Sequence, residues 1–140
     1  MLADAIVLVA GMSTRIRSLT GGLPKSFLKV GNETLIGRTQ RLLRAAGVES
    51  VTLVTGFEAE TFEEAFPEST FVHNPDFATT NTSVSLSLAL NARKDAQDRP
   101  VLVVNGDVYY EEGILEAMLA RREHTLAAVT RHDLCEEEVK

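Results

Sequence analysis

The chain has 140 residues, of which 44% are hydrophobic and 24% are charged, and its formal net charge is −6. This composition is typical of a globular protein with one domain, which we expect to span residues 1–140. An acidic chain lacks the broad basic face that a general nucleic-acid or anionic-membrane binder needs, so any anion site must be local.

Strands and helices are expected to alternate along the chain. An apolar, β-branched run at 5–10, ended by Gly11, predicts a strand buried on both faces. Helical spacing of apolar residues over 35–46, with Gly47 as the C-terminal stop, predicts the first helix. The same patterns predict strands at 50–56, at 69–74, up to Asn105 and at 125–131, and helices at 58–66 and 111–123. Such alternation with short loops predicts a doubly wound, mostly parallel, Rossmann-like α/β sheet.

The segment NTSVSLSLAL at 81–90 fits two structures. Its apolar residues alternate with serines, and a period of two predicts a strand. A helix that starts after an Asn81 cap is the alternative. That helix would be apolar on two sides and would need cover from other elements. The pattern alone leaves both structures open.

The loop after the first predicted strand is basic and rich in glycine. From residue 5 to residue 32 every charged side chain is positive, namely Arg15, Arg17, Lys25 and Lys29. In a doubly wound sheet, ligands bind beyond the carboxyl ends of the strands. Flexible glycine backbone, free amide groups and cationic side chains suit phosphate oxygens there. We therefore interpret 11–25 as a phosphate-binding loop, although neither a P-loop pattern nor G-x-G-x-x-G occurs; a solvated basic loop is the alternative.

A carboxylate follows the buried strand that ends at Asn105. In a parallel sheet this strand delivers Asp107 to the same edge as the basic loop. Proteins bind Mg²⁺ through one or two carboxylates, while substrate phosphates and water complete the octahedron. Asp107 is therefore the candidate magnesium ligand. The alternative is that NGD at 105–107 is an ordinary turn.

Few signals bear on the compartment. The single Cys135 excludes an internal disulfide, and no run approaches the roughly 18 apolar residues of a membrane span. The first residues carry Asp4 where a signal peptide would have a basic region. We expect a cytoplasmic protein with no membrane contact.

The first loop and its flanks resemble the signature of the nucleotidyltransferases that activate sugar phosphates and related phosphomonoesters. That family's pattern is A-G-x-G-x-R, roughly nine residues, then P-K, which AGMSTR at 10–15 and PK at 24–25 resemble. Ser13 stands where many members have a second glycine, and Ser18 replaces a common proline. The first departure is expected to alter the fit around the triphosphate, and the second only the stiffness of the loop.

Two later stretches resemble the branch that contains phosphocholine cytidylyltransferases. VNGDVYY is one of them, and the other is an N-x-x-[YF]-x-x-x-N-x-x-x-S-L pattern met by Asn74, Phe77, Asn81, Ser85 and Leu86. The resemblance covers essentially the whole chain, favours a helix at 82–92, and implies that Asn81 and Ser85 face the base or sugar of a nucleotide.

The resemblance also implies a reaction: a phosphate or phosphonate oxygen attacks the α-phosphorus of a nucleoside triphosphate and pyrophosphate leaves. CTP is the implied triphosphate, and phosphocholine, aminoethylphosphonate or an alcohol or sugar phosphate is the implied acceptor. Lys25 and Arg15 are the implied catalytic residues, and Asp107 is the implied holder of Mg²⁺. The implied nucleotide-binding residues are Ala10, Gly11, Met12, Ser13, Thr14, Arg15, Lys25, Asn81 and Ser85.

In the family, the part that follows supplies acceptor-binding residues and a second metal-binding carboxylate. We therefore expect a C-terminally truncated fold of the nucleotide-diphospho-sugar transferase type, with weak turnover alone. An exposed sheet edge is expected to favour a homodimer. A non-catalytic nucleotide-binding or sensing domain stays open as an alternative. A dinucleotide-dependent oxidoreductase is disfavoured because G-x-G-x-x-G is absent.

Overall fold

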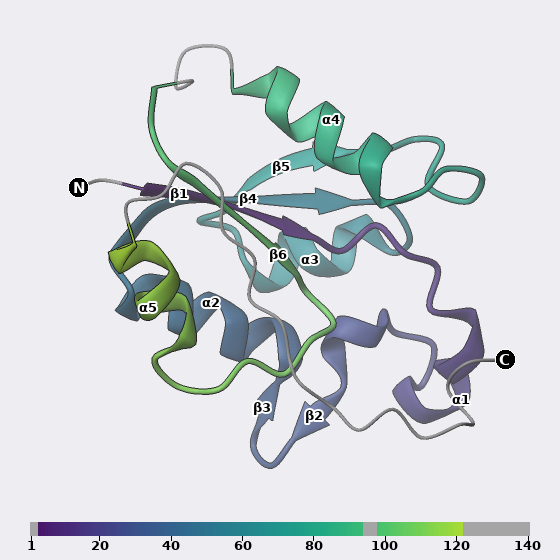
Figure 1. The fold of residues 1–140 in the computed structure, drawn as a ribbon. Helices are drawn as coiled ribbons and strands as arrows, with labels where there is room; N and C mark the ends of the chain where they lie inside the picture. The colour runs from purple at the N-terminus through teal and green to yellow at the C-terminus, as the bar shows by residue number, and fades with distance from the viewer. Residues whose placement is uncertain (1–2, 94–97, 122–140) are drawn as a thin grey trace, which may run out of the picture.

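A computed structural model describes residues 3–93 and 98–121. Its central sheet has four parallel strands in the order β5-β4-β1-β6 (Figure 1). Their bounds are Ala3–Leu8 for β1, Val48–Thr55 for β4, Thr70–His73 for β5 and Val101–Asn105 for β6. A small antiparallel hairpin forms a second sheet from β2 (Lys29–Val30) and β3 (Glu33–Thr34). The strand predicted at 125–131 lies outside the described residues.

Strand β1 lies at the centre of the fold and is buried on both faces, as its apolar run predicts. Ala5 and Val7 pack into a core cluster with residues of α2 (Leu35–Ala45), α3 (Ala59–Ala65) and α5 (Ile114–Ala120). Ile6, on the opposite face, packs against α4 (Thr82–Ala92). Figure 1 shows α4 on one side of the sheet and α2 and α5 on the other. The doubly wound α/β fold is confirmed.

Helix α2 forms where the apolar spacing predicts it. The Thr34 side chain caps its first turn by accepting a hydrogen bond of 3.0 Å from the Gly37 amide. One face of the helix is buried in the core. Beyond its end, Gly47 adopts a φ of 83°, a left-handed conformation that glycine allows at low cost.

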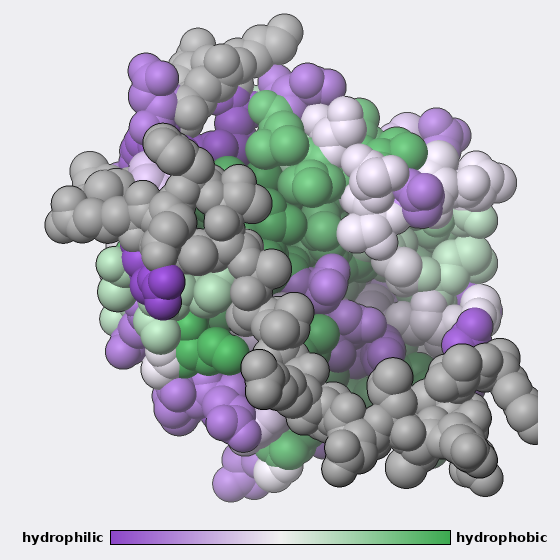
Figure 2. All heavy atoms as spheres, viewed as in Figure 1, coloured by the Kyte–Doolittle hydropathy of each residue, from purple (hydrophilic) through white to green (hydrophobic). Residues whose placement is uncertain are grey.

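The segment at 81–90, for which the sequence left a strand and a helix open, is a helix. Asn81 caps α4, and its side chain accepts a hydrogen bond from the Ser83 amide. Only Ser85 and Ala89 of α4 are buried, while Val84 and Leu90 are 37% and 42% exposed. Figure 2 shows hydrophobic residues gathered over this helix and the adjoining sheet. The cover that we expected for this apolar helix is therefore not supplied by the described part of the chain.

The basic loop contains short helical turns that the sequence patterns did not predict. They are two 3-10 turns, Thr14–Ile16 and Lys25–Phe27, and the single turn of α1, Arg17–Thr20. The last helix was predicted too long. It begins at Ile114 rather than 111, because Gly113 has a φ of 81° and cannot continue a right-handed helix. Among the described residues no helix is long and apolar enough to cross a membrane.

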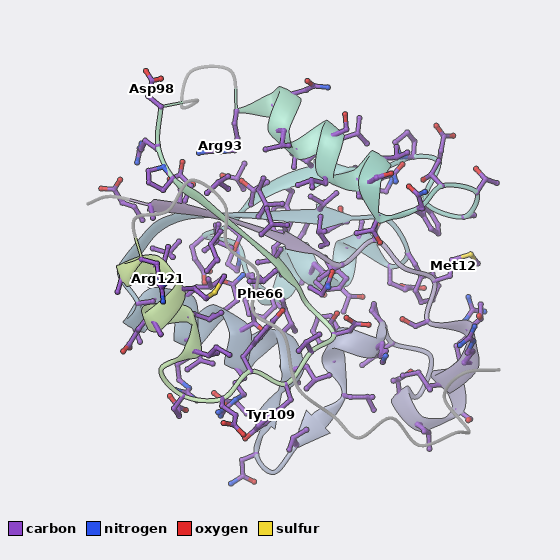
Figure 3. All side chains as sticks on the ribbon, viewed as in Figure 1. Met12, Phe66, Arg93, Asp98, Tyr109 and Arg121 are labelled. Atoms are coloured by element: carbon purple, nitrogen blue, oxygen red, sulfur yellow. The ribbon has the colours of Figure 1, made fainter. Side chains whose placement is uncertain are left out.

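A buried ion pair ties the amino-terminal end of the sheet together. The Asp4 carboxylate lies 2.8 Å from the Arg93 guanidinium and 3.4 Å from that of Arg99. The Asp4 and Arg93 side chains are only 9% and 12% exposed. Figure 3 shows Arg93 after the end of α4, at the opposite end of the sheet from Met12. The pair therefore joins β1 to the end of α4 and the start of β6, away from the basic loop.

We expect Asp4→Asn to lower the free energy of unfolding by about 3 kcal/mol, since breaking a buried ion pair is costly. Glu49→Gln is the matched control, because Glu49 pairs with Arg99 at 2.6 Å but its side chain is 47% exposed. That change is expected to cost less than about 1 kcal/mol. Urea unfolding followed by circular dichroism measures both, and equal losses would contradict a special role for Asp4.

Candidate functional site

The carboxyl ends of the strands meet at one edge of the sheet, as the parallel fold predicts. Leu8 of β1 pairs with Val54 of β4 and with Asn105 of β6, so these strands end in register. Their exit segments surround a crevice of about 270 Å³. The crevice is lined by 8–11, Ser13, 24–26, Phe77, 80–82, Ser85, Asn105 and Asp107.

The two halves of the basic loop are joined by a serine. Ser13 has a φ of 54°, a left-handed conformation in which glycine is more comfortable. Its hydroxyl oxygen accepts a hydrogen bond of 2.8 Å from the Lys25 amide. The departure from the family's second glycine therefore has a structural consequence: the serine side chain fixes the Lys25 backbone next to Ser13.

Lys25 and Asp107 face each other across the crevice. The Lys25 Nζ atom lies 3.3 Å from an Asp107 carboxylate oxygen, and both side chains are nearly half exposed. An exposed pair of this kind contributes only about 0–1 kcal/mol. Breaking the pair therefore costs little free energy, and each group can bind another charged partner instead. The sequence prediction that the basic loop and Asp107 converge is met by this geometry.

Two glycines allow the strand exits to approach closely. A Cβ atom at Gly106 would lie 2.3 Å from Val9 Cγ1, and one at Gly56 would lie 2.5 Å from the Phe77 Cβ and 2.7 Å from the Ala10 carbonyl oxygen. Any side chain at either position would push the lining segments apart. The missing side chain at Gly106 thus lets the turn with Asp107 lie against β1 and Val9. The missing side chain at Gly56 lets Phe77 lie close to the end of β4.

A buried asparagine organises the far wall of the crevice. The Asn74 amide nitrogen donates hydrogen bonds of 3.0 Å to the hydroxyls of Thr80 and Ser85. The Asn74 side-chain oxygen, Oδ1, accepts a hydrogen bond of 3.0 Å from the Asp76 backbone amide. Ser85 lines the crevice, but its hydroxyl is already engaged by Asn74. Asn81 also lines the crevice and caps α4. Contact of either residue with a nucleotide stays a prediction.

Some predicted residues lie away from the crevice lining. Ala10, Gly11, Ser13 and Lys25 line it, whereas Met12, Thr14 and Arg15 are not among its lining residues. Arg15 is exposed on the 3-10 turn, and its catalytic role stays a prediction. Nearby, the Arg17 guanidinium lies 4.7 Å from the centre of the Phe57 ring. Nothing in the local sequence signalled this contact, because it joins α1 to a loop that is distant in the chain.

Tyr110 closes the turn that carries Asp107. Its hydroxyl accepts a hydrogen bond from the Asn105 amide and donates one to the Asn105 carbonyl, each at 3.1 Å. Burial raises the pKa of Tyr110, which keeps the hydroxyl protonated and able to make both bonds. The turn from 105 to 110 is therefore closed by a side chain that the sequence patterns did not single out.

The donor set at this edge fits a magnesium ion shared with phosphates. Among the described residues no group of three or more acidic, histidine or cysteine side chains gathers as a ready metal site. Asp107 offers one accessible carboxylate, and Mg²⁺ is commonly held by one or two carboxylates plus phosphate oxygens and water. The residues present therefore fit an ion that arrives with a polyphosphate, not one in a closed protein cage.

The sequence of the chain is similar to those of known NTP transferases. The family model of the MobA-like NTP transferase domain matches residues 5–137. The chain is 32% identical over 133 residues to the CMP-5'-(3-aminopropyl)phosphonate synthase of Streptomyces rubellomurinus, covering 91% of this chain and 20% of that protein. It is 34% identical over 112 residues to the mannose-1-phosphate guanyltransferase of Schizosaccharomyces pombe, covering 76% and 31%.

A solved structure shares the fold. The CTP:phosphocholine cytidylyltransferase of Streptococcus pneumoniae superposes with a TM-score of 0.70 and 26% identity, over 81% of this chain and 49% of that one. The chain therefore spans between one fifth and one half of the length of these similar proteins.

The Ser13 hydroxyl predicts a split between two substitutions. Ser13→Ala removes the hydrogen bond to the Lys25 amide and keeps a side chain at a positive φ, so we expect the free energy of unfolding to fall by about 1–2 kcal/mol. Ser13→Gly removes the same bond but relieves the backbone, so we expect a change within about 0.5 kcal/mol. Thermal or urea unfolding separates them. A Gly variant as unstable as the Ala variant would show that backbone strain at this position is unimportant.

Proposed function

We propose that this chain, which belongs to the MobA-like NTP transferase domain family, moves a nucleoside monophosphate from a nucleoside triphosphate to an oxygen of a phosphate or phosphonate, with release of pyrophosphate. The observation that carries the proposal is the crevice in which Lys25 and Asp107 face each other and which Gly11 also lines. One group suits an anion and the other a metal, so the pair matches both components of a metal–triphosphate complex.

The main chain and Lys25 supply most of the proposed work. No protein nucleophile is required, so catalysis rests on positioning two anions and on stabilising the charge that shifts toward the leaving pyrophosphate. The main chain at Gly11 would hold the triphosphate, together with Arg15. The Ser13 hydroxyl holds the Lys25 backbone in place, and the Lys25 ammonium group would stabilise the α-phosphate as it becomes five-coordinate.

Mg²⁺ is the proposed metal, with Asp107 as the carboxylate that would hold it. When bound, it supplies positive charge to the phosphate oxygens and draws them into line. Because a single carboxylate offers a weak site by itself, we propose that the ion enters with the triphosphate.

CTP is the triphosphate that we favour. Two of the three similar proteins above are named for CMP or CTP chemistry, and their acceptors are a phosphonate and phosphocholine. The third is named for guanylyl transfer to mannose 1-phosphate, which makes GTP with a sugar phosphate the second candidate.

We propose that the activity takes place in the cytoplasm. In the described sheet β6 pairs only with β1, which leaves one edge of β6 open. A homodimer formed through this edge stays a prediction.

Pyrophosphate release tests the proposal directly. The protein is incubated with Mg²⁺, with CTP, UTP, GTP, ATP or dTTP, and with phosphocholine, 2-aminoethylphosphonate, inositol phosphate or a hexose 1-phosphate. We expect release with CTP and a phosphocholine-like or phosphonate acceptor. Tight triphosphate binding without product for any pair would instead support a non-catalytic nucleotide-binding domain.

Lys25→Ala is expected to lower turnover by about 10²–10³-fold, as the loss of one stabilising group in a transition state does elsewhere. Triphosphate binding should weaken much less, because the main chain at Gly11 remains. Lys29→Ala is the matched control: Lys29 is exposed on β2 and is not among the residues that line the crevice. Pyrophosphate release and calorimetric titration with CTP measure the two effects, and equal, small losses in both would remove the assigned role.

A further inference from the structure

An arginine outside the crevice reaches the turn that carries Asp107. Arg38 lies on α2, and its Nε donates a hydrogen bond of 2.6 Å to the carbonyl oxygen of Tyr110. Its guanidinium carbon lies 4.3 Å from the centre of the Tyr109 ring. Figure 3 shows Tyr109 beside the β2–β3 hairpin. Arg38 therefore touches two consecutive residues of one turn, one through the backbone and one through an aromatic face.

The remaining nitrogens of Arg38 face two acids. They lie 3.4 Å from Glu33, on β3, and 3.4 Å from Glu112, just beyond the turn. The Arg38 side chain is only 11% exposed. A planar guanidinium with donors in fixed directions suits such a set of partners, and a flexible ammonium group does not. The group thus joins α2, the hairpin and the turn.

The contact with Tyr110 is where this network meets the site. The Tyr110 hydroxyl is bonded to both backbone groups of Asn105, which ends β6. Arg38 holds the backbone of the same tyrosine through its hydrogen bond to the carbonyl oxygen. The short segment between Asn105 and Tyr110 is therefore fixed at both ends, and Asp107 lies within it. The position of Tyr110 therefore limits the positions open to the backbone of Asp107, whose carboxylate faces Lys25.

We propose that Arg38 is a positioning residue that fixes the Asn105–Tyr110 turn and thereby the Asp107 carboxylate in the crevice. The inference rests on the proposed function in one respect, because it takes Asp107 to be the ligand of the magnesium ion. Arg38 itself makes no hydrogen bond or ion pair with the residues that line the crevice, so it acts through the turn. Groups that hydrogen-bond a metal ligand directly change metal affinity by about 10–100-fold when they are lost, and for Arg38, which acts through the turn, we expect the lower end of that range.

Arg41 offers a matched control on the same helix. It shares both acids with Arg38, with hydrogen bonds of 2.6 Å to Glu33 and 2.8 Å to Glu112. Hydrogen bonds from Arg41 lower the pKa of both carboxyl groups, so these acids stay charged near neutral pH. The Arg41 side chain is 46% exposed, and within the described part of the chain its hydrogen bonds go to carboxylates, not to the backbone of the turn. Loss of Arg41 therefore removes charge but not the hold on Tyr110.

The first test needs no metal and no turnover. Amide hydrogen exchange by NMR follows the Asn105 amide, whose acceptor is the Tyr110 hydroxyl, with the Val7 amide in central β1 as the reference for global opening. Arg38→Met is expected to raise the Asn105 exchange rate by tenfold or more relative to Val7, and Arg41→Met by less than twofold. Equal rates in wild type and Arg38→Met would overturn the inference. If the Met variant does not fold, Arg38→Lys takes its place, with an expected rise between those two values.

The second test reads the metal. Mn²⁺ binding in the presence of CTP is measured by electron paramagnetic resonance, with Asp107→Asn as the variant that lacks the ligand. Arg38→Met should weaken Mn²⁺ binding about tenfold and Arg41→Met less than twofold. Mn²⁺ affinity equal to wild type in Arg38→Met would overturn the positioning role. A wild-type protein that binds no more Mn²⁺ than Asp107→Asn would overturn the assigned ligand, and with it the positioning role, whatever the exchange rates show.

Discussion

The burial of β1 on both faces is the constraint on which the rest of the structure depends. Because Ala5 and Val7 face one layer of helices and Ile6 faces the other, β1 must lie between two strands and end at the edge that they share. Backbone hydrogen bonds continue beyond the strand ends: the Gly106 amide donates to the Leu8 carbonyl oxygen, and the Val9 amide donates to the Val54 carbonyl oxygen. The loops of three strands are thus held within reach of one another, and glycines at the closest approaches leave the space that this requires.

The first loop is positively charged, although the whole chain is acidic. With a net charge of −6, the protein repels a triphosphate at long range, so attraction must come from the local excess of positive charge on the first loop. Asp107 reduces that excess while it pairs with Lys25. A cation at Asp107 would release Lys25 for a phosphate, so the proposed metal and the proposed triphosphate favour each other's binding. The exposed pair is weak enough for this exchange.

Much of the fold was predictable because apolar runs report burial directly. The buried strand ending near Leu8 and helix α2 follow from such runs, and parallel topology then brings the basic loop and Asp107 together. Helix α4 was ambiguous for a physical reason. Only two small residues of it are buried, so its pattern of apolar side chains does not report the face that packs. The contacts of Arg38 were not predictable either, because they depend on how α2 sits against a turn 72 residues away.

Ser13 shows how a departure from a family pattern can be accommodated. A side chain at a positive φ costs about 1–3 kcal/mol, and a hydrogen bond from a backbone amide returns about 0.5–1.5 kcal/mol. The two terms are similar in size, so the serine neither strongly stabilises nor strongly destabilises the loop. What differs from glycine is geometry: the hydroxyl links Ser13 to the Lys25 amide, which a glycine at this position cannot do. The loop gains a fixed position of the Lys25 backbone at nearly constant stability, which suits the proposed stabilisation of charge by preorganised groups.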